Sequence, residues 1–332
     1  MEDLGKRKET KKSEVIKKVI RADIRFKKRN VKKKRIAIIT IISKNYGNRL
    51  QNFALQEFLK KLGFETFTIP YKANVKEIMK EKLKLLLFRL SAYFRNRWVW
   101  EDFNRKYIRW ERLNIDSKRQ NASYDYFIAG SDQIWNPIFW INSEREFLIP
   151  FDKNKRIAYA ASIGIDQLPE EYRQRYQQYF TGIPHISVRE AKAADIIYDL
   201  TGRKVPVVID PTMLLSRKDW EALMSTCKIE VHKRYILRYF LGTKTSGYEK
   251  YISEKAANEG LEIVDLLDGR GNAKRKIGPG EFIFYIANSE CTYVDSFHGA
   301  VFSILFSRPF IVFERPYEEG AGIMTSRLDT LL

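Results

Sequence analysis

The segment that decides the fold is Cys291-Thr-Tyr-Val-Asp-Ser-Phe-His-Gly-Ala-Val-Phe-Ser-Ile-Leu305. A short apolar run is followed by the polar residues Asp295, Ser296 and His298, and Gly299 then opens an apolar stretch with helical spacing. This order predicts a strand, a loop and a helix. In an open parallel sheet such loops form the ligand crevice, and the helix behind the loop presents free N–H groups and a positive dipole end to an anion.

His298 therefore lies where an anionic ligand would be bound. A lone histidine is usually a structural residue, and that role is the alternative here. Of the three histidines, only His298 has hydroxyl and carboxylate neighbours at a predicted strand end, and the others are His185 and His232. Because the three histidines lack the spacing of metal ligands, we expect no metal site.

The composition is that of a globular chain large enough for two domains. The 332 residues are 44% hydrophobic and 14% aromatic, which is ample for packed cores and excludes a disordered chain. The two cysteines, Cys227 and Cys291, form no CxxC pair, which argues against a disulfide framework or a cysteine-ligated zinc site. No apolar run is long enough to span a membrane, and the N-terminus lacks the apolar core of a signal peptide. We therefore expect a cytoplasmic protein.

Positive charge is concentrated at the N-terminus. Residues 1–35 contain 16 Lys and Arg but only 5 Asp and Glu, so this stretch carries +11 of the formal net charge of +19. We interpret residues 1–34 as a basic N-terminal extension. Weak amphipathic spacing favours a segment that lies peripherally on the anionic inner face of the membrane, although a solvated extension without a partner fits the same composition. Because no RNA-binding motif is present, we expect no specific nucleic-acid partner.

Alternating strands and helices predict two Rossmann-like domains, residues 35–212 and 234–332, joined by a linker over 213–233. The first domain includes a basic, aromatic helical segment over 75–118. We assign its rings to the core rather than to stacking on single-stranded nucleic acid. Two such halves would face a central cleft lined by the polar ends of their strands.

Two loops of the first half carry polar residues directly after apolar strands. The first contains Asn45, Gly47 and Asn48, and the second contains Ser131 and Asp132. The glycine lets the backbone approach a ligand, and the asparagines either cap the following helix or bind that ligand. The first loop lacks the full glycine pattern of a dinucleotide site, so it indicates a ligand without identifying a nucleotide.

The same half ends with two further strand ends that carry charge. A short strand over 185–188 includes Ser187 and delivers Arg189 to the start of a helix. Another predicted strand, over 205–210, ends in the carboxylate of Asp210. In a parallel sheet these strand ends lie at one edge, which predicts that the polar residues of the four loops meet there.

Five motifs stand in the order in which they occur in polysaccharide pyruvyl transferases, a family that the chain resembles from about residue 35 to its C-terminus. They are residues 45–51 (NYGNRLQ), 130–136 (GSDQIWN), 187–190 (SVRE), 210–212 (DPT) and 295–299 (DSFHG). The resemblance implies an α/β fold that is glycosyltransferase-B-like, with two Rossmann-type parallel-sheet domains facing a central cleft. It also implies an enzyme that moves the pyruvyl group of phosphoenolpyruvate onto a sugar of a surface polysaccharide or its lipid-linked precursor, forming a pyruvate ketal.

The resemblance assigns roles to individual residues. His298 matches the family's catalytic histidine and Arg189 its phosphoenolpyruvate-binding arginine. A guanidinium binds carboxylate and phosphate groups through two parallel hydrogen bonds, which suits Arg189 to this donor. Ketal formation needs a proton on the donor's methylene carbon, and a histidine beside an anion is a suitable general acid. No cofactor is implied, because phosphoenolpyruvate is itself a substrate. We expect the substrates to be bound by Asn45, Gly47, Asn48, Ser131, Asp132, Ser187, Ser296 and Arg315.

Two features depart from the family's pattern. Some members have an arginine where this chain has Ser296, so a second positive contact to the donor either is missing or comes from another residue, for which Arg315, Arg49 and Arg238 are the candidates. The chain also stops at Leu332, where a family member usually continues its last helix, and we expect the second domain to lack that helix.

Two other functions fit parts of the sequence. A glycosyltransferase that uses a nucleotide sugar would share the same two-domain fold, because one fold supports many reactions. A protein that binds a polyanion or a lipid surface through residues 1–34 would belong to another class.

Overall fold

The computed structural model describes most of the chain from residue 33 onward. The described residues are 33–42, 45–69, 92–111, 117–138, 144–230, 233–267, 277–315 and 326–332. Apart from its last two residues, the predicted basic extension over 1–34 lies outside them, so contact of this extension with a membrane stays a prediction. Two parts of the predicted helical segment, 75–91 and 112–116, also lie outside the described residues.

The first half is built on a five-stranded parallel sheet in the order β2-β1-β3-β4-β5. Its strands are β1 (Arg35–Ile39), β2 (Glu65–Thr68), β3 (Tyr126–Ala129), β4 (Arg156–Ala161) and β5 (His185–Val188). The last four residues of β1 are all buried, as expected for an apolar strand that is covered on both faces.

The second half is built on a four-stranded parallel sheet in the order β7-β6-β8-β9. Its strands are β6 (Tyr235–Tyr239), β7 (Glu262–Asp265), β8 (Cys291–Val294) and β9 (Phe310–Val312). Two all-parallel sheets in sequence confirm the predicted α/β class, and the fold is glycosyltransferase-B-like with two Rossmann-type halves.

Helices connect the strands and cover the sheets. They are α2 (Tyr46–Lys61), α4 (Ala92–Tyr107), α5 (Ser117–Ser123), α6 (Glu170–Thr181), α7 (Ala191–Thr201), α8 (Arg217–Met224), α9 (Ser246–Glu259), α10 (Pro279–Ala287), α11 (Phe297–Leu305) and α12 (Ser326–Leu331), with short 3-10 turns η1 (Lys153–Lys155) and η2 (Pro211–Leu214).

Both sheets reverse their strand order at the same kind of position. In the first sheet β1 lies between β2 and β3, and in the second β6 lies between β7 and β8. At such a point the connections leave to opposite sides, which opens a crevice at the carboxyl ends of the two central strands. The loops after β1 and β3, and those after β6 and β8, are therefore the places where this fold binds ligands.

The segment that decides the fold forms the predicted strand, loop and helix. Strand β8 ends at Val294, and α11 begins at Phe297. Ser296 is the N-cap, with extended backbone angles and a side chain that accepts a hydrogen bond from the Gly299 N–H at 3.5 Å. Gly299 itself packs closely, because a Cβ at this position would meet the Val294 side chain.

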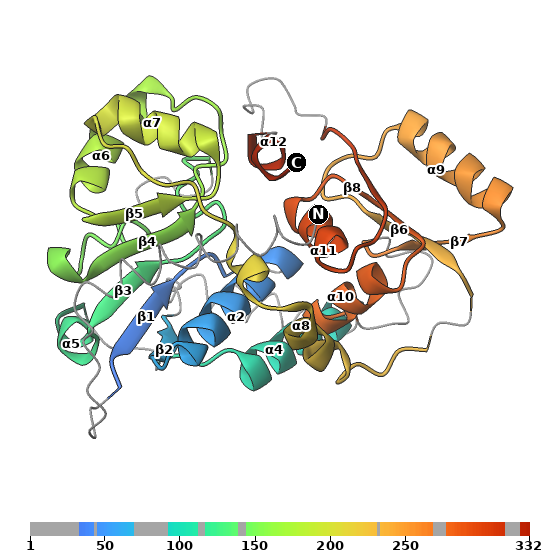
Figure 1. Ribbon diagram of the computed structural model, residues 1–332, viewed down its shortest axis with the longest axis horizontal. Helices are drawn as coiled ribbons and strands as arrows, with labels where there is room; N and C mark the ends of the chain where they lie inside the picture. The colour runs from blue at the N-terminus through green and yellow to red at the C-terminus, as the bar shows by residue number, and fades with distance from the viewer. Residues whose placement is uncertain are drawn as a thin grey trace, which may run out of the picture.

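The two halves share a continuous hydrophobic core. Tyr46, at the start of α2, stacks on Trp100 of α4 and on Phe282 of α10, with ring centroids 4.9 and 4.7 Å apart. Figure 1 shows α2, α8 and α10 following one another below the two sheets, while α12 lies between the two lobes. This shared core forms the base on which the ligand-binding ends of both sheets stand.

Two segments differ in detail from the sequence-based expectation. The stretch over 213–233, predicted as a linker, includes helix α8, which begins with a capping box between Ser216 and Asp219. The strand predicted over 205–210 is reduced to one bridge, between Val207 and Val188. Pro206 supplies only its carbonyl to this pairing, because proline has no N–H to extend the ladder.

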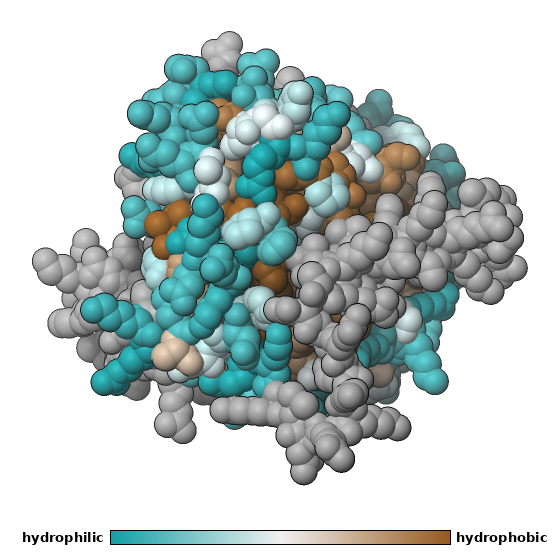
Figure 2. Space-filling model, turned by 60° about the vertical axis from the view of Figure 1, so that its left-hand side comes forward, coloured by the Kyte–Doolittle hydropathy of each residue, from teal (hydrophilic) through white to brown (hydrophobic). Residues whose placement is uncertain are grey.

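The surface is mostly hydrophilic on the face that Figure 2 shows, with hydrophobic residues visible in the recesses between charged and polar ones. Within the part of the chain that the structure describes, none of the helices combines the length and the apolarity needed to cross a membrane.

Trp220 tests the shared core. Its indole is fully buried against Phe53 of α2 and Phe302 of α11, and its N–H donates to the Thr212 carbonyl at 3.1 Å. We expect Trp220→Ala to lower the free energy of unfolding by about 3–5 kcal/mol, since it leaves a large cavity where the halves meet. Urea unfolding followed by circular dichroism would measure this. Tyr198→Ala, at a side chain that is 52% exposed, is the control and should change stability by less than about 0.5 kcal/mol.

Candidate active site

The loops at the two strand-order reversals face each other across a cavity of about 360 Å³. Its lining comes from both halves and consists of Ile41, Asn45, Asn48, Asp132, Gln133, Leu241, Ser296, Phe297, His298, Arg315 and Arg327. Six of the ten residues that the sequence predicts for the site line this cavity. They are Asn45, Asn48, Asp132, Ser296, His298 and Arg315.

His298 lies in the first turn of α11, and its side chain is largely buried. Its ring rests directly against the backbone of Gly47, where a Cβ would overlap the imidazole. Because Gly47 has no side chain, α2 of the first half can approach the histidine of the second half closely. The Nε2 atom of His298 is 3.6 Å from Oδ2 of Asp210 and has no hydrogen-bond partner among the described residues.

Asp210 is the buried centre of the polar network behind the cavity. Its Oδ1 accepts from the N–H and the hydroxyl of Thr212, and its Oδ2 accepts from Ser131 Oγ at 2.8 Å and Arg189 Nη1 at 2.7 Å. Burial alone would raise the pKa of the Asp210 carboxyl, but His298, Arg189 and the Thr212 N–H outweigh it and hold that pKa well below its usual range. The carboxylate is therefore ionised at neutral pH.

Arg189 lies behind the cavity rather than in its lining. Besides the bond to Asp210, its Nη2 is 3.5 Å from Oδ1 of Asp132, and its guanidinium stacks on the ring of Phe297 at 4.2 Å. Burial alone would lower the pKa of Arg189, but Asp210 and Asp132 outweigh it and raise the pKa. The Nε atom of Arg189 is buried and has no hydrogen-bond partner among the described residues.

Asp132 reaches the cavity from a strained backbone position. Its φ of +69° lies in the left-handed region, which non-glycine residues adopt rarely and often at functional sites. The Asn48 side-chain amide donates to its Oδ2, and its Oδ1 accepts from the Gln133 N–H. Burial would raise the pKa of Asp132, but Arg189, His298 and Arg327 outweigh it and lower the pKa. Asp132 thus presents an ionised acceptor to the cavity.

Helix caps position two more of the predicted residues, and an ion pair holds a third. Asn45 is the N-cap of α2, with a side chain that accepts from the Asn48 N–H, and Ser296 is the N-cap of α11. Arg315 lies after β9, and its Nε is 3.1 Å from Oδ2 of Asp295. Asp295 also accepts from the N–H groups of Leu241 and Gly242, so it ties Arg315 to the loop after β6.

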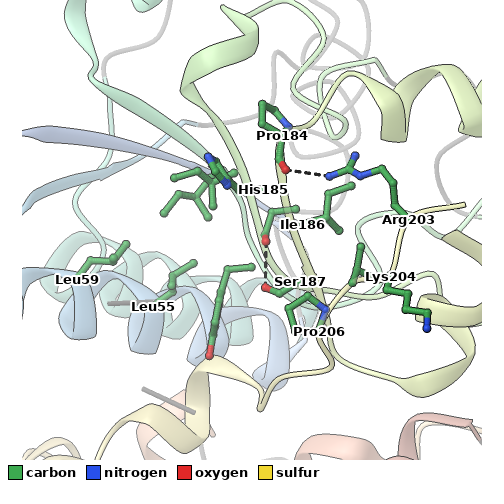
Figure 3. Close-up of a pocket in the computed structure, with 14 residues that line it drawn as sticks. Leu55, Leu59, Pro184, His185, Ile186, Ser187, Arg203, Lys204 and Pro206 are labelled. Carbon is green, nitrogen blue, oxygen red and sulfur yellow. Dashed lines mark hydrogen bonds between the residues drawn. The ribbon is translucent and has the colours of Figure 1, made fainter. Parts of the chain in front are cut away.

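The structure does not bring Ser187 to the cavity. Its Oγ donates to the Ala158 carbonyl at 3.1 Å, and the residue borders a separate pocket of about 200 Å³ together with Leu55, Leu59 and Pro206 (Figure 3). Successive residues of a strand point to opposite faces, and Val188, next to Ser187, packs in the core on the other face of the sheet. The position of Ser187 near a strand end therefore did not place its side chain at the site.

Sequence reasoning did not choose Asp210, Gln133, Phe297 or Arg327 as site residues, nor the apolar Ile41 and Leu241 that also line the cavity. Asp210 had a signal, because it ends the predicted strand over 205–210 within the DPT motif, but its role as the buried partner of Arg189 and His298 required the fold. Gln133 lies in the motif over 130–136, next to the predicted site residue Asp132. Phe297 lies in the motif over 295–299, between the predicted site residues Ser296 and His298. Arg327 had no signal at all, since α12 returns to the cavity from the far end of the chain.

No group of three or more histidine, cysteine, aspartate or glutamate side chains that could hold a metal ion occurs within the described residues. The chemistry available at the cavity is instead that of one imidazole, two guanidinium groups and one ionised carboxylate, with amides and a hydroxyl around them. Such a set can bind an anion, donate a proton and accept a hydrogen bond from a hydroxyl group.

The model of a family described as polysaccharide pyruvyl transferase matches residues 45–316. The UDP-GlcNAc 2-epimerase from Neisseria meningitidis bound to UDP-GlcNAc is similar with a TM-score of 0.46 and 10% identity, over 90% of this chain and 85% of that one. E. coli heptosyltransferase WaaC with ADP-2-deoxy-2-fluoro heptose is similar with a TM-score of 0.41 and 11% identity, over 87% of this chain and 92% of that one. No curated protein matches the sequence.

The ionised state of Asp210 predicts a pH dependence of stability. Because its pKa in the folded chain lies below the value of about 3.9 in the unfolded chain, its contribution is present above about pH 4 and is lost as the pH falls further. We expect Asp210→Asn to cost about 3–5 kcal/mol at pH 7, since Arg189 loses its closest partner. The difference from the wild type should shrink by about 1 kcal/mol by pH 3.

Urea unfolding between pH 7 and pH 3 measures this difference. Asp195→Asn, on the exposed side of α7, is the control for the loss of a carboxylate outside the network. A difference that stays constant or grows down to pH 3 would contradict the ionised, charge-paired state of Asp210.

Proposed function

Because this chain belongs to the polysaccharide pyruvyl transferase family, we propose that it transfers the pyruvyl group of phosphoenolpyruvate to a sugar of a surface polysaccharide or its lipid-linked precursor. The chain is a transferase by family. The observation that supports the proposed reaction is the placement of His298, which stands in a polar cavity at the strand-order reversals of both sheets, against the backbone of Gly47. A cavity shared by two halves suits an enzyme that must hold a donor and an acceptor together.

The reaction joins two hydroxyl oxygens of the same sugar to C2 of the donor. A proton adds to the methylene carbon C3, which becomes the methyl group, and C2 develops oxocarbenium character. One hydroxyl oxygen bonds to C2 and loses its proton. The second hydroxyl oxygen then bonds to C2 as the bond from C2 to the phosphate oxygen breaks, and the second proton leaves with inorganic phosphate. Of the two protons released by the sugar, one replaces the proton given to C3, so the reaction is balanced.

His298 is the proposed general acid that delivers the proton to C3. Its Nε2 stands 3.6 Å from Oδ2 of the Asp210 carboxylate, which is placed to orient the ring. After the proton has left, the neutral ring can accept a proton from the attacking hydroxyl. Asp132 is the proposed partner of the acceptor sugar, because its ionised carboxylate lines the cavity and can accept hydrogen bonds from sugar hydroxyls.

The remaining predicted residues are proposed in supporting roles. Arg189 holds Asp132 and Asp210 in place and contributes its charge from behind Phe297. Asn45 and Ser296 cap the two helices that meet at the cavity, and both line it. Ser187 is left outside the proposed site, since it borders another pocket.

Substitution of His298 tests the proposed reaction. We expect wild-type protein to bind phosphoenolpyruvate saturably in isothermal titration calorimetry, and His298→Gln to bind it with an affinity within a few-fold of that value. With methyl hexopyranosides as acceptor probes, release of inorganic phosphate should fall by about 10²–10⁴-fold in the variant, because the general acid is lost.

Titrations with UDP and GDP under the same conditions provide the comparison. Binding of either nucleotide by wild-type protein, without binding of phosphoenolpyruvate, would favour a glycosyltransferase that uses a nucleotide sugar and would overturn the proposed donor. If the His298→Gln variant released phosphate at the wild-type rate, phosphoenolpyruvate would remain the proposed donor, but His298 would not be its general acid.

Gly47 offers a second test, because its lack of a side chain is what admits the imidazole. We expect Gly47→Ala to displace His298 or the start of α2, and to lower phosphate release from phosphoenolpyruvate by at least about 10-fold. Gly247→Ala is a matched control in the first turn of α9, where a Cβ meets nothing closer than 4.0 Å. Both changes improve helix propensity, so a loss confined to Gly47→Ala would isolate the steric contact with His298. Equal activity of the two variants would contradict it.

A further inference from the structure

The C-terminal helix α12 brings one more cation to the cavity. Arg327 lies in its first turn, beyond the residues that the family model matches, and its side chain lines the cavity between the two halves. The helix contacts both α7 of the first half and α11 of the second. Thr330 fixes it to the first half, because its Oγ1 accepts from the Ala191 N–H at the start of α7. Figure 1 shows α12 in this position between the lobes.

The two arginines that line the cavity differ in how their charge is compensated. Arg315 is paired with Asp295, through Nε to Oδ2 at 3.1 Å and through Nη2 to the main-chain carbonyl at 3.0 Å. Arg327 makes no ion pair with a carboxylate among the described residues. Its Nη1 and Nη2 instead meet the Gln133 amide oxygen at 2.7 and 2.8 Å, in the amide orientation that presents an acceptor to them. A neutral amide holds the guanidinium in place without cancelling its charge.

Two other features of Arg327 suit the binding of an anion. Its Nε is buried and has no hydrogen-bond partner within the described residues. Burial and the neighbouring Arg189 lower the pKa of Arg327 to about 10, against the opposing effect of Asp132 and Glu190, so the group stays charged at neutral pH. Desolvation of a cation that has no ion pair is costly, and ionisable groups in such surroundings are enriched at functional sites.

We propose that Arg327 binds an anionic group of phosphoenolpyruvate, its carboxylate or its phosphate, and that Gln133 holds the guanidinium in place without neutralising it. This inference rests on the proposed function and adds the second donor-binding cation that the motifs left open. Arg189, paired with Asp132 and Asp210, then serves as a positioning residue, and α12 becomes part of the donor site. The planar guanidinium matches the two oxygens of a carboxylate or phosphate in a way that an ammonium does not.

Gln133→Glu gives the sharpest test, because it keeps the size of the side chain and places a carboxylate opposite Arg327. We expect this variant and Arg327→Gln each to weaken phosphoenolpyruvate binding at least 10-fold in isothermal titration calorimetry. Arg327→Lys should retain only part of the wild-type affinity, since lysine keeps the positive charge but lacks the planar guanidinium that donates two parallel hydrogen bonds. Thermal unfolding of Gln133→Glu should be unchanged or shifted upward, because the new ion pair stabilises α12 against the first half.

One control separates the effect of net charge from donor binding. Lys192→Gln removes one positive charge from the exposed side of α7. It should leave the affinity for phosphoenolpyruvate within about 3-fold of the wild type. Competition by inorganic phosphate and by pyruvate, measured on wild-type protein and on Arg327→Gln, identifies the group that Arg327 contacts. The competitor whose binding weakens in the variant carries that group.

The outcomes distinguish this inference from the proposed function. If wild-type protein does not bind phosphoenolpyruvate, both fail together. If the wild type binds it and both Arg327→Gln and Gln133→Glu bind it within 2-fold of the wild type, the donor stands and the role of Arg327 is overturned. If Arg327→Gln loses affinity but Gln133→Glu does not, the charge of Arg327 is not what the donor uses, and the inference also fails.

Discussion

The buried carboxylate of Asp210 is the interaction on which the site depends. It accepts hydrogen bonds from Ser131 in the loop after β3 and from Arg189 at the end of β5. His298, on α11 of the other half, lies 3.6 Å from it. A charge buried this completely is tolerated only when its hydrogen bonds and counter-charges are in place. The partners that make burial of this carboxylate possible are therefore held in fixed positions. They include Arg189 of the first half and His298 of the second, so the network also sets the distance between the two halves.

The fold supplies what this network needs. Each sheet reverses its strand order beside its first strand, and the shared core of α2, α4, α8, α10 and α11 sets the two reversals face to face. The packing tolerance at this junction is small, since the ring of His298 lies against Gly47 where no Cβ would fit. In a packed interior, a side chain at position 47 would shift whole elements of structure. The glycine therefore leaves room for the histidine and also keeps the elements around the cavity in place.

The charged groups around the cavity differ in whether they are paired with each other. Arg189 and Arg315 are matched by carboxylates, and they serve as fixed parts of the frame. Asp132 faces the cavity as an ionised acceptor, while Arg327 faces it with an amide as its hydrogen-bond partner and no ion pair among the described residues. An acceptor for hydroxyl groups and a cation without an ion-pair partner are the two features that a sugar and phosphoenolpyruvate would require of one enzyme site.

The sequence by itself determined the elements and the chemistry of their ends. The period of the apolar residues predicted β8 and α11 within a residue or two, and the polar residues after β1, β3 and β8 were recognised as site candidates because parallel strands end at one edge. Only the tertiary structure decided which of them meet. Ser187 faces away because strand side chains alternate, Arg189 is taken up by two carboxylates, and Arg327 enters from a helix distant in sequence. Such long-range contacts leave no local pattern, since they arise from the packing of elements rather than from the period of any one of them.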